Sequence, residues 1–351
     1  MPAAVHARAT RTHARMSSVS AAVHKEFETR LALSVKSLET TTRAVLCEEL
    51  VSPQEAAEIR KLRALIRRLL DSPRHVMLRR AGSGPFVRFE VLQGETWRVF
   101  SGLRPMMKRR FFPTLSDEEQ FAYPSKTTTT TAAARQRTLH VAPTRRVQLS
   151  GVKPPPRAET NAAFCSGYGA EHGALVHRQL QLIVDSLLHG YRSPIDSHEV
   201  IDPCVGAIIA TIQKYEWLPF AAELGVFDAE HRVATQADLV VYDRLAKAIR
   251  VVELTFGYES VDFENALSPD DLFEAPLDFV PNSPAQRKLL QVYMTAEIIR
   301  RNYGIANVQR ALVRVRPCDH KVDVYTEKDV PWWSEAAALR RAYDTLSQRA
   351  E

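Results

Sequence analysis

Two carboxylates interrupt apolar runs within residues 236–256, which read QADLVVYDRLAKAIRVVELTF. Asp238 lies at the start of the first run, Glu253 lies near the end of the second, and a polar segment separates the runs. A lone carboxylate in an apolar strand costs several kcal/mol unless it is paired or holds a metal ion. Two such residues in neighbouring runs therefore predict a site at which carboxylates do chemistry.

The two apolar runs predict a β-hairpin. With residues 244–247 as the turn, Asp243 pairs with Ala248. In that register Asp238 lies directly opposite Glu253, with Cβ atoms about 5 Å apart on one face. Two carboxylates this close repel each other unless a positive charge lies between them, which favours a hard cation with oxygen ligands. Alternatively, one acid faces solvent and the other meets an arginine, since a register slip of one residue separates the pair.

The segments around the hairpin predict a mixed α/β core. Apolar residues recur at helical spacing in three segments, and shorter apolar runs predict strands. In chain order we expect helices over 173–191 and 203–215, a strand over 218–228, the hairpin, a helix over 283–304, and strands over 308–317 and 320–326. Ser283 followed by Pro284 predicts the start of the long helix. This order is typical of a central sheet with helices on its faces.

The order of these motifs resembles the core of the PD-(D/E)XK nuclease superfamily. Its strand with an Asp, turn, and strand with a Glu match Asp238 and the VVELT of Glu253, and there the two acids bind magnesium. The helical GALVH resembles the Gly-x-x-x-His motif of the RecB-like branch, which includes the mitochondrial genome maintenance exonucleases. The resemblance thus makes His177 the histidine beside the metal. Glu223 falls on the preceding strand, where this branch often has another acid.

The resemblance continues downstream and spans roughly residues 165–326. Gln291 matches the glutamine on the helix after the catalytic strands, and ALVRV and KVDVYT match the closing strands. It implies an α/β fold with a restriction-endonuclease-like mixed central sheet flanked by helices. It also implies that His177, Glu223, Asp238 and Glu253 bind Mg²⁺ (or Mn²⁺) for the hydrolysis of phosphodiester bonds.

One catalytic position departs from the pattern of the superfamily. Its Glu-x-Lys is Glu253-Leu254-Thr255 in this sequence. The lysine normally orients the attacking water and balances charge on the phosphate, whereas a threonine hydroxyl carries no charge. Lys288, three residues before Gln291 at the border of the apolar helix face, is our candidate for the relocated cation. An ordinary solvated lysine is the alternative interpretation.

Three functions are compatible with these patterns. The first is a magnesium-dependent nuclease in mitochondrial DNA maintenance, with nucleic acid as its partner and DNA expected rather than RNA. The second is a catalytically inactive nuclease-like domain that binds nucleic acid or serves as a scaffold in a ribonucleoprotein, which the missing lysine favours. The third keeps only the fold and acts as a protein-interaction module.

Charge is distributed unevenly along the chain, which carries a net charge of +6. Residues 1–160 contain 28 Lys and Arg against 14 Asp and Glu, while the rest contains 19 against 27. A basic half can attract a polyanion, and an acidic half can hold metal ions. The first 25 residues contain arginines but no acid, which is typical of a mitochondrial presequence and predicts the matrix as the location. A disordered basic tail on a cytoplasmic or nuclear protein is the alternative.

We divide the chain into four predicted regions: a presequence (1–25), a basic accessory region with an amphipathic helix and a hairpin (26–123), a linker rich in Thr and Pro (124–160), and the nuclease-like domain (161–346). Within the last region, the acidic segment 257–284 is an insertion that either covers the site or decorates the edge of the sheet. The accessory stretch RPMMKRRFF (104–112) mixes bases with aromatic residues, a weak signal for single-stranded nucleic acid.

Two classes of protein are disfavoured by the composition. No apolar run approaches the roughly 18 residues that a membrane-spanning helix needs, so we expect no membrane partner. The four cysteines are far apart and form no CxxC pair, which argues against a zinc ribbon, a cysteine-ligated iron–sulfur cluster or a disulfide scaffold.

Overall fold

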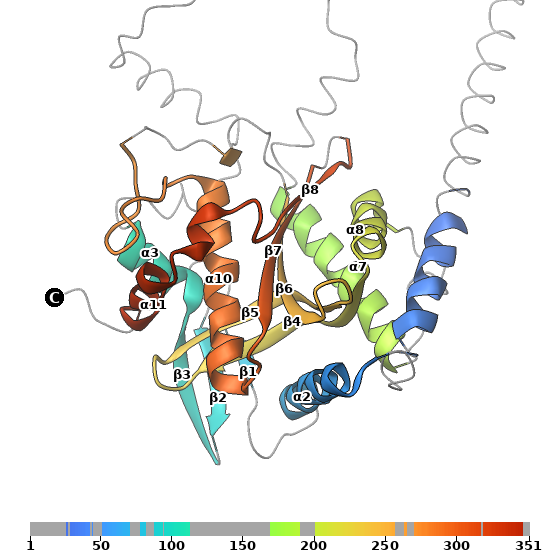
Figure 1. Ribbon diagram of the computed structural model, residues 1–351, viewed down its shortest axis with the longest axis horizontal. Coiled ribbons are helices and arrows are strands. Elements are labelled where there is room, and N and C mark those ends of the chain that lie inside the picture. The colour runs from blue at the N-terminus through green and yellow to red at the C-terminus, as the bar shows by residue number, and fades with distance from the viewer. Residues whose placement is uncertain are drawn as a thin grey trace, which may run out of the picture.

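Figure 1 shows the computed structural model, which describes residues 26, 29–42, 44, 51–70, 78–81, 88–93, 95–112, 169–189, 201–256, 263–264, 270–316 and 319–346. The predicted presequence and linker lie outside these residues. Among the described helices, none combines the length and the hydropathy that a bilayer crossing requires.

A mixed sheet of eight strands forms the centre of the fold, so the expected α/β class with a mixed central sheet is confirmed. The strands are β1 (Leu78–Ala81), β2 (Arg88–Gln93), β3 (Thr96–Gly102), β4 (Trp217–Asp228), β5 (Val233–Asp243), β6 (Ala248–Phe256), β7 (Val308–Val315) and β8 (Val322–Tyr325). Their order is β1-β2-β3-β5-β6-β7-β8, with β4 paired to β5. The β3–β5 and β6–β7 pairs are parallel and the others antiparallel.

Helices cover both faces of this sheet, and each face has its own apolar cluster. One cluster joins the strands to α2 (Pro53–Leu70), α3 (Leu103–Phe111), α10 (Pro284–Tyr303), the short helix η3 (Pro331–Ser334) and α11 (Ala336–Asp344). The other joins them to α7 (Gly169–His189) and α8 (Pro203–Lys214). Figure 1 shows α10 and α11 on one side of the strands and α7 and α8 on the other. Both faces of the central strands are therefore buried, as their near-continuous apolar runs require.

Helix starts follow the capping residues that the sequence predicts. The Ser52 backbone N–H donates to Glu55 Oε2 at 2.6 Å, and the Glu55 N–H donates to Ser52 Oγ at 3.4 Å, which closes a capping box. Ser283 Oγ accepts from the Gln286 N–H at 3.2 Å. The same helix, α10, ends at Gly304, whose φ of 67° lies in the left-handed region that glycine adopts without steric cost. The predicted bounds of α10, 283–304, are confirmed to within a residue, whereas α7 begins four residues before the predicted start at 173.

The β5–β6 hairpin has the predicted register. Asp243 pairs with Ala248, and the pairing continues to Leu239 opposite Val252. The next two positions in this register are Asp238 and Glu253. The observed ladder thus ends one position before the two acids, whose direct opposition stays a prediction.

Strand β5 has two different partners along one of its edges. Strand β4 accompanies its whole length from Val233 to Asp243. On the other edge, β3 pairs with Val233 and Ala234, whereas β6 pairs only from Leu239 onward. The edge therefore forks, and residues 235–238 lie between the two partners.

The fork also unites two ranges that we separated in the sequence. Strands β1–β3 and helices α2 and α3 come from residues 26–123, yet they share the sheet and one apolar cluster with residues 201–346. The described part of the acidic segment packs on this unit as well, because the Glu274 N–H donates to the Phe111 carbonyl at 2.8 Å. The ring centroids of Phe273 and Phe112 lie 5.5 Å apart. The accessory range thus contributes directly to the fold around the fork.

Candidate metal and catalytic site

Asp238 lies at the fork of β5, where backbone pairing with β6 stops. The Leu254 N–H, which has lost a strand partner, donates instead to Asp238 Oδ2 at 2.7 Å. A buried backbone N–H without a partner costs free energy, so this side chain completes the ladder where the strands diverge. Only 7% of Asp238 is exposed. The side chain of Asp238 is therefore held in place at the point where β6 separates from β5.

Glu253 is bound by two cations from two different helices. Its Oε1 accepts from Lys288 Nζ on α10 at 2.7 Å and from Arg104 Nη2 on α3 at 3.1 Å. Burial alone would raise the pKa of Glu253, but the positive charge of Lys288 and then that of Arg104 lower it. Glu253 is consequently ionised, and two long cationic side chains converge on it.

Glu223 on β4 adds a third carboxylate, and its backbone is strained. Its φ of 53° lies in the left-handed region, which costs a non-glycine residue about 1–2 kcal/mol. Ala222 packs in the cluster of α7 and α8, while Leu224 packs in the cluster of α10, so the normal alternation of the strand is interrupted at Glu223. Strained residues persist where the surroundings impose them, and they gather at functional sites.

His177 reaches this group from α7. Its Nδ1 lies 2.6 Å from Glu223 Oε1, and its ring packs edge-on against Phe256, with centroids 5.5 Å apart. Burial opposes the charge of the imidazole, but the negative charge of Asp238 and the hydrogen bond to Glu223 outweigh it and raise the pKa of His177. Burial, followed by the charge of Glu253, likewise raises the pKa of Asp238. Neighbouring carboxylates therefore contribute to both shifts, together with burial in the case of Asp238.

A metal ion could be held by three of the four predicted ligands. One ligand atom each from His177, Glu223 and Asp238 lies within 4.8 Å of the other two, although exposed acidic groups also cluster without an ion. Two carboxylates and one imidazole suit Mn²⁺, and carboxylate oxygens suit Mg²⁺. Glu253 is outside this trio, and its Oε1 instead contacts Lys288 and Arg104. The alternative interpretation is that one acid meets an arginine and the other faces solvent. Glu253 does meet an arginine, Arg104, but neither acid faces solvent, because both are buried.

The two predicted residues on α10 lie where expected. Gln291 is buried, with 4% of its surface exposed, and its Oε1 accepts from Arg104 Nε at 2.7 Å. Lys288 is not an ordinary solvated lysine, because it binds Glu253 and only 21% of its side chain is exposed. Thr255 lies two residues beyond Glu253 on β6 and is also buried.

Arg104 is the site residue that the sequence does not predict. It lies in the first turn of α3, which follows β3 without a loop, so the fork of β5 brings it to Glu253. In the sequence it belongs to a basic stretch far from the hairpin. A strand that leads directly into a helix with an arginine in its first turn is the only signal, and it is a weak one.

No protein-family model matches the chain, and no curated protein matches it significantly. The geometry of the described residues is therefore the basis for the function that follows.

Proposed function

We propose that this protein is a divalent-metal-dependent nuclease of the PD-(D/E)XK type, related to the RecB-like branch, that hydrolyses phosphodiester bonds of DNA. The observation that carries the proposal is the arrangement at the fork of β5. Three buried or half-buried carboxylates, Glu223, Asp238 and Glu253, lie on adjacent strands, with His177 at one end and Lys288 at the other. The mixed sheet flanked by helices supports a restriction-endonuclease-like fold.

The residues present fit a Mg²⁺ or Mn²⁺ ion. Held by His177, Glu223 and Asp238, with Glu253 beside them, such an ion would supply a hydroxide near neutral pH and stabilise the departing oxygen. Glu223 also orients the imidazole of His177 through the contact at Nδ1. Asp238 is oriented in turn by the Leu254 N–H.

Lys288 and Arg104 supply the positive charge that Thr255 cannot. Both cationic groups lie within 3.1 Å of Glu253 Oε1, so they are fixed at the site before substrate arrives. Cations fixed in advance stabilise charge that develops on a phosphate without reorganisation during the reaction. Gln291 positions Arg104 by accepting from its Nε.

A catalytically inactive domain that binds nucleic acid is the second candidate. Lys288 and Arg104 contact Glu253 and offset its charge, and Thr255 occupies the usual lysine position. A site closed by its own cations could retain nucleic-acid binding, or a scaffold role in a ribonucleoprotein, without chemistry. The third possibility, a protein-interaction module, requires neither activity.

The decisive experiment is cleavage of end-labelled single- and double-stranded DNA and RNA by the full chain with Mg²⁺, with Mn²⁺ or with EDTA. We expect metal-dependent cleavage of DNA that Asp238→Asn reduces by on the order of 10³-fold or more, because the variant loses a ligand charge at the centre of the site. Glu216→Gln, an exposed acid at the other end of β4, is the matched control and should retain full activity. Metal-independent binding without cleavage would support the inactive domain instead, and neither binding nor cleavage would support the interaction module.

A second variant tests the relocated lysine. Lys288→Met keeps the aliphatic stem but removes the charge, so it should lower the cleavage rate by about 10²-fold while Mn²⁺ affinity changes little. Lys247→Met, an exposed lysine in the hairpin turn, is its control. Full activity in Lys288→Met would contradict the role that we give this residue.

Mitochondrial location is part of the proposal, with the cytoplasm or nucleus as the alternative. It is supported by the arginine-rich, acid-free first 25 residues. A fusion of residues 1–40 to a fluorescent reporter tests it, and a diffuse cytosolic signal would count against it.

A further inference from the structure

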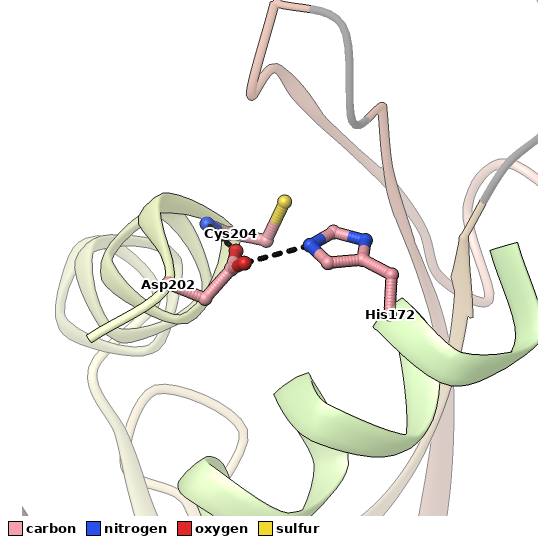
Figure 2. A group of neighbouring side chains, drawn as sticks. All are labelled: His172, Asp202 and Cys204. Carbon is pink, nitrogen blue, oxygen red and sulfur yellow. Dashed lines mark hydrogen bonds and ion pairs between the residues drawn. The ribbon is translucent and has the colours of Figure 1, made fainter. Parts of the chain in front are cut away.

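A second group of potential metal ligands lies on α7 and at the start of α8. Figure 2 shows the side chains of His172, Asp202 and Cys204 gathered at this point. One ligand atom of each lies within 4.8 Å of the other two, and His172 Nε2 is 2.7 Å from Asp202 Oδ2. From the turn that precedes β8, His320 places Nδ1 at 3.7 Å from Cys204 Sγ. Three side chains thus gather, and His320 approaches the thiol of Cys204 from another part of the chain.

Helix capping explains only part of this arrangement. Asp202 is the N-cap of α8, and its Oδ1 accepts from the Cys204 N–H at 2.8 Å. That cap uses one carboxylate oxygen and requires neither a thiol nor an imidazole. The second oxygen faces His172, while Gln179 fixes the backbone by accepting from the Asp202 N–H at 2.9 Å. The carboxylate is therefore held in place with one oxygen directed at the other candidate ligands.

The ligand set selects one class of metal. A thiol, imidazole nitrogens and one carboxylate oxygen are the ligands of zinc, whereas Mg²⁺ and Ca²⁺ take oxygen. Tetrahedral zinc separates its ligand atoms by about 3.3–3.6 Å, as follows from bond lengths of about 2.0–2.3 Å. The distance of 3.7 Å between Cys204 Sγ and His320 Nδ1 is already close to this value. The contact between His172 and Asp202 would lengthen by less than about 1 Å.

We propose that His172, Asp202 and Cys204 bind a zinc ion, with His320 as the fourth ligand. On binding, the thiol releases its proton to solvent and the sulfur bonds to the metal as thiolate. Ten per cent of the His172 side chain and 14% of the Asp202 side chain are exposed, so the ion can enter from the surface. The ion would fasten the first turn of α7, the start of α8 and the turn before β8 together. Four protein ligands leave no open position, which makes this a structural site.

Cobalt is the probe that separates this site from the carboxylate site, because only this one offers a thiolate. The full chain titrated with Co²⁺ should show the near-ultraviolet absorption of thiolate-to-cobalt charge transfer. Cys204→Ser should lack this absorption. Asp238→Asn, altered in the carboxylate site, should retain it. A wild-type chain without the absorption, or a Cys204→Ser variant that keeps it, would overturn the proposal.

Zinc affinity, measured by competition with a chromogenic chelator, provides the second readout. His320 is exposed, so His320→Ala should leave the circular dichroism spectrum unchanged while it weakens zinc binding by about tenfold or more. This variant, together with His172→Asn, carries the test if Cys204→Ser fails to fold. Unchanged zinc affinity in both folded variants would reject the site, whatever the outcome of the DNA cleavage assay.

Discussion

The β5–β6 hairpin buries acids at both of its ends, and the two ends compensate their charge differently. At the turn, Asp243 Oδ2 accepts from Arg250 Nε at 2.9 Å and from Trp217 Nε1 at 3.0 Å, while its Oδ1 accepts from the Ala246 N–H at 2.8 Å. At the open end, Asp238 accepts a hydrogen bond from one backbone N–H and lies beside two further carboxylates. Burial is similar at the two ends, so burial alone does not distinguish them.

Charge balance distinguishes the two ends. Around the turn, Arg250 contacts both Asp243 and Glu327, and Arg310 also contacts Glu327, so the acids and bases match. At the fork, three carboxylates lie beside two long cationic side chains. Burial and then the charge of Glu253 raise the pKa of Asp238, and the charge of Asp238 raises that of His177. A matched network stabilises a fold, whereas an unmatched one leaves room for a cation from solvent.

The largest expected effect is the loss of stability when the matched end is broken. Arg250→Met leaves Asp243 buried without its cation, which should cost about 3–5 kcal/mol in the free energy of unfolding. Arg244→Met is the control in the same turn. Its exposed contact with Glu216 is 3.7 Å long, so its loss should cost less than about 1 kcal/mol. Urea denaturation measures the free energy of unfolding of both variants. If Arg250→Met and Arg244→Met lose the same stability, the buried ion pairs at the turn do not stabilise the fold as proposed.

An effect of the opposite sign is expected at the unmatched end. Burial and then Glu253 raise the pKa of Asp238, so between about pH 4 and that raised pKa the folded chain keeps a proton that the unfolded chain releases. The contribution of Asp238 to stability is therefore present below about pH 4 and lost as the pH rises through the raised pKa. Asp238→Asn has no carboxyl group to ionise, so its stability does not fall in this pH range. Its Oδ1 can still accept a hydrogen bond from the Leu254 N–H.

In EDTA at pH 8 we accordingly expect Asp238→Asn to be more stable than wild type by at least about 1.4 kcal/mol, which corresponds to one unit of pKa. The gain should shrink toward zero as the pH falls to about 4. Asp243→Asn is the matched control and should lose stability at the same pH values. A destabilised Asp238→Asn at pH 8 would show that the fork holds no excess of negative charge.

The smallest expected effect concerns backbone strain, which both ends share. Glu223 at the fork and Glu216 near the turn have the same φ of 53°. Glycine adopts this region without steric cost, so at each position the Gly variant should be more stable than the Ala variant by about 1 kcal/mol. If the Gly and Ala variants differ in thermal stability by the same amount at both positions, strain is equal at the two ends. Charge, and not strain, would then distinguish them. A Glu223→Ala variant as stable as Glu223→Gly would instead mean that the strand relaxes at the fork.

Local rules were sufficient to predict the hairpin and its acids. A four-residue turn fixes the register, which holds from Asp243 opposite Ala248 to Leu239 opposite Val252, one position before the two acids. Lys288 and Gln291 could be placed because a capped helix has a regular period. Arg104 could not be placed, because its approach depends on the parallel pairing of β3 with β5, which the local sequence does not encode. The left-handed conformation of Glu223 was equally hidden, since no glycine marks it.

The zinc candidates were missed for a related reason. Metal sites are found in a sequence when their ligands are close together, as in CxxC pairs, and here the ligands are spread from His172 to His320. Cys204 also looked like a small apolar residue within a helix. Burial and then Asp202 raise the pKa of its thiol to about 12, which agrees with an unreactive thiol.

The pairing of β3 with β5 also affects the order in which the sheet can fold during synthesis. Strands β1–β3 are synthesised well before β5, the strand that pairs with the edge of β3. All of residues 103–232 must be synthesised between them. At roughly 5–20 residues per second, the N-terminal hairpin waits on the order of ten seconds with an unpaired edge. Pairings this distant in sequence form late and leave intermediates that aggregate easily. Efficient production of this protein should therefore depend on chaperones that shield strands β1–β3 until β5 has been made.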